Sequence, residues 1–73
     1  PVVARLARDQ TAARDLRWEA LRQCLAMDTR AGLVLLDALA DDQADMLSAP
    51  AVALQRQLRE RRPDLAPFMA EIA

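Results

Sequence analysis

Residues 30–47 of the chain read RAGLVLLDALADDQADML. Apolar side chains recur in this segment at helical spacing, and on a helix they share one face: Leu33, Leu36, Leu39, Ala40 and Leu47. Aspartates recur every four residues along the other edge, and we call them the acidic row: Asp37, Asp41 and Asp45. The pattern predicts an amphipathic helix over residues 30–47, with one face in the core and the acidic row in solvent.

The composition of the whole chain favours helix as strongly as this segment does. The 73 residues are 53% hydrophobic, mostly Ala and Leu, with a single glycine, Gly32. Residues that favour strands are few, and the length suits one domain near the lower limit for a self-sufficient core. We therefore predict an all-α fold, a small antiparallel helical bundle of three to four helices, with residues 1–73 as one domain.

Capping and breaking residues divide the chain around that segment. The apolar pattern of residues 2–27 predicts a first helix that either continues unbroken and packs against another chain or breaks near Asp9-Gln10-Thr11. We favour the break, with Asp9 or Thr11 as the N-cap of the helix that follows. Asp28 or Thr29 is expected to cap the helix over 30–47, and Ser48 to cap a third over 49–61. Pro63 should end the third helix, and Asp64 should cap a short last helix.

The acidic row has three interpretations: a solvated face, a docking surface for an Arg-rich partner or second copy, and a metal site. One helix face spreads carboxylates along its axis instead of converging them, which disfavours a metal. Residues 1–27 carry five Arg against three acids, residues 28–47 one against five, and residues 48–73 four against three. Because both flanking segments are basic, the acidic row is expected to orient the bundle or its self-association.

Amphipathic helices without catalytic residues are typical of a protein–protein interaction module, such as an adaptor, accessory subunit, chaperone or inhibitor. We expect a protein partner, either a second copy in a homo-oligomer or a heterologous protein. The predicted core is Leu33, Leu36, Leu39, Leu47, Leu54 and Leu58. The predicted partner-binding residues combine shared core and interface positions with the acidic row: Trp18, Leu21, Leu25, Met46, Phe68, Met69, Asp37, Asp41 and Asp45.

An alternative function is nucleic-acid binding through a basic cluster at the end of the third helix, Arg56, Arg59, Arg61 and Arg62. Glu60 and Asp64 interrupt this cluster, and no aromatic platform accompanies it. Arginines at the C-terminus of a helix also complement its dipole, which accounts for the cluster without a ligand. Nucleic acid is therefore the less favoured partner.

Catalytic chemistry has few candidate residues. The chain has no His, Tyr or Lys, its only serine is the expected cap Ser48, and its only cysteine, Cys24, lies on an apolar arc. No triad, phosphate loop or zinc motif can be assembled, so we predict neither an enzyme nor a cofactor nor a metal. The single cysteine and the absence of a signal peptide or a membrane-length apolar run favour the cytoplasm. The use of Arg in place of Lys is typical of a GC-rich bacterial genome.

A resemblance to one enzyme family concerns the amino terminus. Pro1-Val2-Val3, an Arg-bearing segment and a helix from about Thr11 resemble the opening of the small tautomerase family. The resemblance covers at most the first third of the chain and implies that Pro1 acts as a general base within a β-α-β fold. The glycine-arginine turn of that family is missing, and residues 48–73 have a helical pattern in place of its closing strands.

Overall fold

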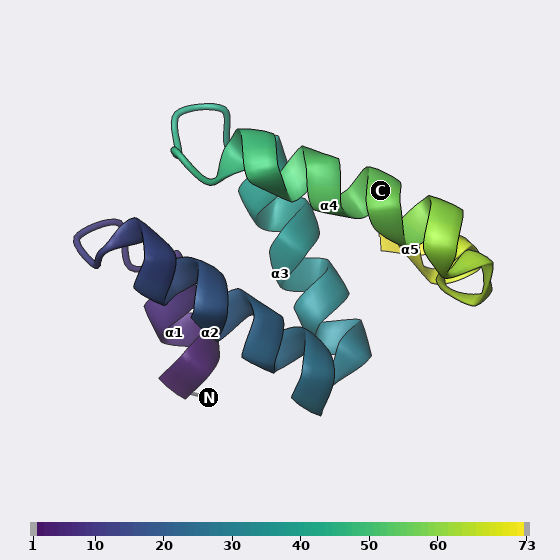
Figure 1. The fold of residues 1–73 in the computed structure, drawn as a ribbon, viewed down its shortest axis with the longest axis horizontal. Coiled ribbons are helices and arrows are strands. Elements are labelled where there is room, and N and C mark those ends of the chain that lie inside the picture. Colours follow the sequence, from purple (N-terminus) through teal and green to yellow (C-terminus); the bar gives the residue numbers. More distant parts are fainter. Residues whose placement is uncertain (1, 73) are drawn as a thin grey trace.

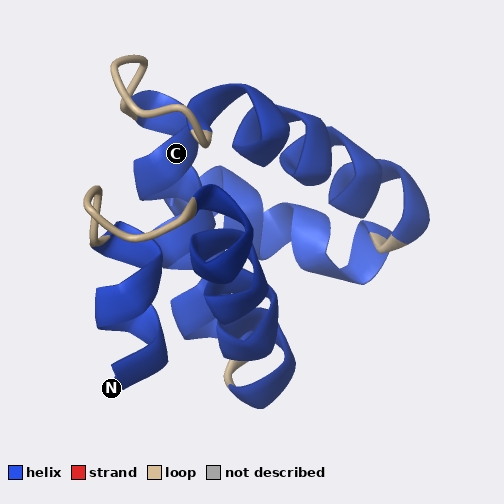
Figure 2. Cartoon of the chain, turned by 60° about the vertical axis from the view of Figure 1, so that its left-hand side comes forward, coloured by secondary structure: helices blue, strands red, loops and turns tan. Residues whose placement is uncertain are grey.

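The computed structural model describes residues 2–72, which form five α-helices and one 3-10 helix and no strand (Figures 1 and 2). The elements are α1 (Val2–Arg8), α2 (Arg14–Met27), α3 (Thr29–Asp41), α4 (Ser48–Arg61), η1 (Pro63–Leu65) and α5 (Ala66–Ile72). The all-α prediction is confirmed for this range. Five α-helices exceed the predicted three to four, because the first segment forms two helices, α1 and α2.

Helix α3 is the centre of the arrangement. It packs against α2, α4 and α5 and more lightly against α1, while α1 packs mainly against α2. In Figure 1, α2 (blue) and α4 (green) flank α3 and run in the same direction across the view. Within residues 2–72 these two flanking helices do not pack closely against each other. None of the helices in this range is long and apolar enough to cross a bilayer.

The predicted break in the first segment is present, but it is stabilised differently from the prediction. One carboxylate oxygen of Asp9, Oδ1, accepts hydrogen bonds from the backbone N–H and the hydroxyl of Thr11, at 3.0 and 2.6 Å. This is an Asx-type turn, in which a side chain satisfies backbone groups at a corner. The N-cap of α2 is Ala13, which has no side-chain cap, so the expectation that Asp9 or Thr11 caps the helix is wrong.

Of the other predicted caps, only Asp28 is confirmed. Its Oδ1 accepts a hydrogen bond from the N–H of Ala31 at 3.2 Å at the start of α3. Ser48 lies inside the first turn of α4, where its hydroxyl donates to the carbonyl of Ala40 at 2.7 Å. That bond ties the start of α4 to α3 instead of capping α4.

The C-terminal end of α4 is also partly as predicted. Helix α4 ends at Arg61, two residues before Pro63. This end is expected, because the residue before a proline avoids the helical conformation. Asp64 does not cap α5, because it lies within η1 and forms an ion pair with Arg62 at 3.0 Å.

Helix α3 ends six residues earlier than predicted. It stops at Asp41, and the chain turns through residues 42–47 before α4 begins. Asp42 and Asp45 each accept a hydrogen bond from the backbone N–H two residues later, on Ala44 and Leu47, at 3.2 and 2.9 Å. Short polar side chains compete for backbone donors in this way and favour turns over helix. The acidic row is therefore not continuous, and the prediction that Asp45 lies on an exposed helix face is wrong.

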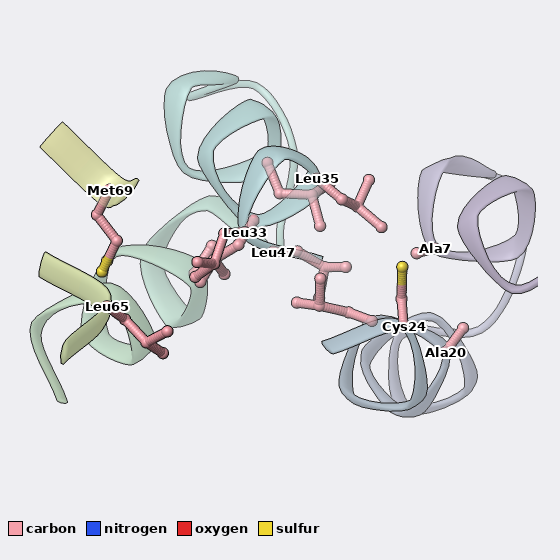
Figure 3. Close-up of a cluster of buried hydrophobic side chains, with 12 residues drawn as sticks. Ala7, Ala20, Cys24, Leu33, Leu35, Leu47, Leu65 and Met69 are labelled. Carbon is pink, nitrogen blue, oxygen red and sulfur yellow. The ribbon is translucent and has the colours of Figure 1, made fainter. Parts of the chain in front are cut away.

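The core is a layer of aliphatic side chains around α3. Four of the six predicted core leucines are buried: Leu33, Leu36, Leu39 and Leu47. The two on α4, Leu54 and Leu58, are half-buried. Figure 3 shows the cluster extending from Met69 and Leu65 at one end to Cys24 and Ala7 at the other. The burial of α4 is thus incomplete on the side of Leu54 and Leu58.

Glycine at position 32 sets how closely α2 and α3 approach. A Cβ atom placed on Gly32 would lie 2.6 Å from the Cα and 2.8 Å from the N of Leu25. Real Cβ atoms do not approach backbone atoms this closely, so a larger residue would force the two helices apart. The single glycine of the chain is therefore explained by this helix crossing.

Candidate partner-binding site

A groove of about 510 Å³ lies between α2 and α4. Apolar side chains predominate in its lining, and the polar side chains are those of Arg22 and Gln57. The lining residues are Trp18, Arg22, Leu25, Ala26, Pro50, Ala53, Leu54, Gln57 and Leu58. Its volume is within the range of natural ligand-binding pockets, which are apolar with a few placed polar groups. The groove is therefore the candidate site.

The groove follows from how the two helices use their faces. On α2, one stripe of residues is buried against the rest of the protein, and it includes Leu21 and Cys24. The next stripe, at helical spacing, carries Trp18 and Leu25 and faces the groove, where both are half-buried. On α4, only Ala51 is buried, so the helix contacts α3 along a narrow strip. Each wall therefore retains apolar surface without an apolar neighbour.

A buried ion pair fixes α2 relative to the turn that leads into α4. Arg17 donates from Nη1 and Nη2 to the two carboxylate oxygens of Asp45, at 3.0 and 2.6 Å, and from Nε to the carbonyl of Ala7, at 3.1 Å. Arg17 is 1% exposed and Asp45 8% exposed. Asp45 also accepts from the N–H of Leu47, so every donor and acceptor of the pair that is buried has a partner.

This arrangement lowers the pKa of Asp45 below its ordinary value of 3.8. The hydrogen bonds from Arg17 are the main cause, and the N–H of Leu47 adds to them, while burial acts in the opposite direction. Arg17 is near the start of α2, and Asp45 precedes α4 by three residues. The pair therefore joins the N-terminal ends of the two groove walls through α1 and the turn.

The pair of Arg17 and Asp45 was not predicted, although the sequence contains a signal for it. Arg17 interrupts an otherwise apolar arc of α2, and a charged residue on a buried face requires a buried partner. Five acids in residues 28–47 were available, and periodicity alone does not select Asp45 among them.

The predicted partner-binding residues do not form one surface. Trp18 and Leu25 line the groove, whereas Leu21 is fully buried beside them in α2. Met46 is 63% exposed in the turn after α3. On α5, Met69 is buried, and Phe68 is 45% exposed beside a smaller hollow that it lines with Thr29, Arg30, Leu33 and Leu65.

The three members of the acidic row have different environments. Asp37 is half-buried and accepts a hydrogen bond from the amide of Gln55 at 3.4 Å, which links α3 to α4. Asp41 is exposed at the end of α3, and Asp45 is buried against Arg17. Among residues 2–72 no three potential metal ligands converge.

The basic cluster at the end of α4 is exposed throughout: Arg56, Arg59, Arg61 and Arg62. Arg62 forms its ion pair with Asp64 at the surface. Hydrogen bonds from the Arg62 guanidinium lower the pKa of the Asp64 carboxyl. Nucleic-acid binding by this cluster stays a prediction.

The tautomerase resemblance receives no support from the fold. Val2–Arg8, where that family requires a strand, is α-helical, and residues 48–72 are helical in place of closing strands. Pro1 itself lies outside the described residues. Cys24 is buried in the core.

No protein-family profile matches the chain, and neither a curated protein nor a solved structure matches it significantly.

Proposed function

We propose that the protein is a small helical interaction module that binds an amphipathic helix of a partner protein in the groove between α2 and α4. One observation carries this proposal: two helices flank α3 without packing on each other, and their facing stripes expose Trp18, Leu25, Leu54 and Leu58 to the space between them. Helix-in-groove recognition uses this geometry, with apolar anchors of one helix entering an apolar channel.

The surface area of the chain supports an unfilled binding face. A compact monomer of 8.1 kDa is expected to expose about 4,500 Å². This chain exposes 4968 Å², which is roughly 500 Å² more than that expectation. Part of this excess lies on the groove walls, where a partner helix would cover it.

Trp18 is the expected centre of the binding energy. Tryptophan is enriched among interface residues whose truncation costs most, particularly in pockets that become fully desolvated. Here Trp18 is half-buried, so α2 already holds its ring in place while part of the surface remains available. An ordered aromatic side chain loses little further entropy on binding.

A bound helix would lie beside α3 with α2 and α4 on either side. The predicted antiparallel bundle stays a proposal, and the groove is the place where a partner helix would extend such a bundle. Adaptor, accessory-subunit, chaperone and inhibitor roles all use binding of this kind.

Selection from a displayed library of short amphipathic helical peptides tests the proposal. The wild-type protein should enrich peptides with apolar residues at helical spacing. Ala53→Trp places a large side chain into the groove and should abolish that enrichment. Val52→Trp is the matched control, since Val52 is the neighbouring exposed residue of α4 but does not line the groove. Absence of enrichment by the wild type, or equal enrichment by Ala53→Trp, would contradict the proposal.

A further inference from the structure

We propose that the helix bound in the groove is an acidic one, whose carboxylate pairs with Arg22 between two apolar anchors. This inference rests on the proposed function, because it specifies the partner of the same site. It concerns the charge and spacing of the partner's contact residues, which the apolar walls alone do not determine.

Among the described residues, Arg22 is the only charged side chain that lines the groove. It is exposed, and among residues 3–72 it has no ion-pair partner. The three ion pairs of this range involve other arginines: Arg14–Asp15, Arg17–Asp45 and Arg62–Asp64. Glu19 precedes Arg22 by almost one turn, but the two side chains form no hydrogen bond or ion pair.

A partner that covered Arg22 with apolar surface would remove a guanidinium from water without replacing its hydrogen bonds, which is unfavourable. A carboxylate placed opposite would satisfy it through charge-assisted bonds, which are stronger than neutral ones. Charge complementarity of this kind selects among partners that have similar apolar surfaces. The groove therefore discriminates in favour of an acidic helix and against a basic one.

The spacing along α2 predicts where the acid lies. Trp18, Arg22 and Leu25 are at positions i, i+4 and i+7, so Arg22 is about one turn from each apolar neighbour. The two walls extend for nine residues each, from Trp18 to Ala26 and from Pro50 to Leu58, or roughly 12 Å of helix. A helix lying along them presents two turns, with apolar anchors about seven residues apart and the acid between them.

A polyanion suits the groove less well than a single carboxylate. Nucleic-acid sites track a backbone with several cations, and the logarithm of their affinity falls with the logarithm of the salt concentration, with a slope proportional to the number of phosphates contacted. Among the described residues, the groove has one cationic side chain, Arg22, between apolar walls. Its uncharged polar side-chain groups are the indole N–H of Trp18 and the amide of Gln57. The observations thus favour a protein helix.

The same peptide library, selected in parallel on three proteins, tests the inference. Peptides selected by the wild type should carry Asp or Glu at one position between two apolar anchors. Arg22→Glu should replace that preference with Lys or Arg while keeping the anchors. Arg59→Glu changes the net charge equally, and Arg59 is exposed and outside the groove, so this control should still select the acid.

Different results would overturn the acidic partner helix and the groove as a binding site. Apolar anchors selected without an acid, or an unchanged acid preference in Arg22→Glu, would overturn the inference and leave the groove as a binding site. No selected peptides at all would overturn the proposed function. Self-association of the wild-type protein that Ala53→Trp abolishes would show that a second copy fills the groove, and it would overturn the assignment to a partner's helix.

Affinities measured by Trp18 fluorescence then give the contribution of the ion pair between Arg22 and the acid of the peptide. Replacing the acid of a selected peptide by Lys should weaken binding to the wild type about tenfold, or about 1.4 kcal/mol. Arg22→Glu should bind the Lys peptide better than the acidic one. A change below about twofold in the wild type would contradict a direct ion pair.

Discussion

Replacing Asp45 by Asn should destabilise the fold more than any single change at the protein surface. The substitution keeps the size of the side chain and removes the charge that faces Arg17. Both side chains are almost fully buried, with 2% of the Arg17 side chain and 3% of the Asp45 side chain exposed. Arg17 would therefore remain in the interior without a counter-charge.

The magnitude follows from the contacts of the pair. Removing one partner of a buried ion pair costs about 3–5 kcal/mol, because the other charge stays buried and uncompensated. The amide introduced by Asp45→Asn would retain an oxygen for the N–H of Leu47 or for Arg17, so the lower end, about 3 kcal/mol, is expected. A domain of 73 residues has a total stability of only about 4–11 kcal/mol. The variant should lose a large part of its stability.

Urea unfolding, followed by Trp18 fluorescence and by helical circular dichroism, measures the loss. Asp41→Asn is the matched control, since it makes the same chemical change at an exposed carboxylate near the end of α3. Its free energy of unfolding should change by less than about 0.5 kcal/mol. The difference between the two variants isolates the effect of burial from the effect of charge.

A second variant separates the ion pair from its surroundings. Arg17→Met removes the guanidinium and also leaves the carbonyl of Ala7 without its donor. Because each single change disrupts the same interaction, the double variant Arg17→Met, Asp45→Asn should cost clearly less than the two single losses added together. Additive losses, or a cost of Asp45→Asn below about 1 kcal/mol, would refute the buried pair.

Three further predictions concern other parts of the fold. Gly32→Ala should lower the free energy of unfolding by about 1–3 kcal/mol in urea, although Ala favours helix, because its Cβ would meet the backbone of Leu25; an increase would contradict the close crossing. Asp28→Ala should cost about 1 kcal/mol in the same assay by removing the cap of α3; no loss would contradict the cap. The pKa of Asp45 is lowered in the fold, so the unfolded chain binds its proton first and the stability from this group is lost as pH falls below about 3.8. Unfolding midpoints measured across that range should fall more steeply for the wild type than for Asp45→Asn, and equal slopes would contradict the shift.

Much of the helical structure could be predicted from the sequence because it depends on local patterns. The spacing of Leu33, Leu36 and Leu39 identifies the buried face of α3. Asp28 marks a helix start through its side-chain cap, and Pro63 marks a helix end through its backbone restriction. The end of α3 could not be predicted in this way. Residues 42–47 continue the helical period, yet their aspartates stabilise a turn by bonding to backbone N–H groups.

The candidate site was only partly predictable for a different reason. Trp18 and Leu25 were expected at an interface because they lie beside the main apolar arc of α2. Leu54 and Leu58 were expected in the core, and they became groove walls because α4 packs on α3 and not on α2. That relative placement depends on contacts between distant residues, such as Arg17 with Asp45, and periodicity along one helix contains no information about them.

Amide chemical-shift mapping by NMR with a selected helical peptide determines whether the groove between α2 and α4 is the partner-binding surface. We expect the largest shifts on the two walls, at the indole of Trp18 and at Arg22, Leu25, Ala53 and Leu58. Shifts centred instead on Phe68 and its hollow, or on Met46, with the groove unchanged, would contradict it.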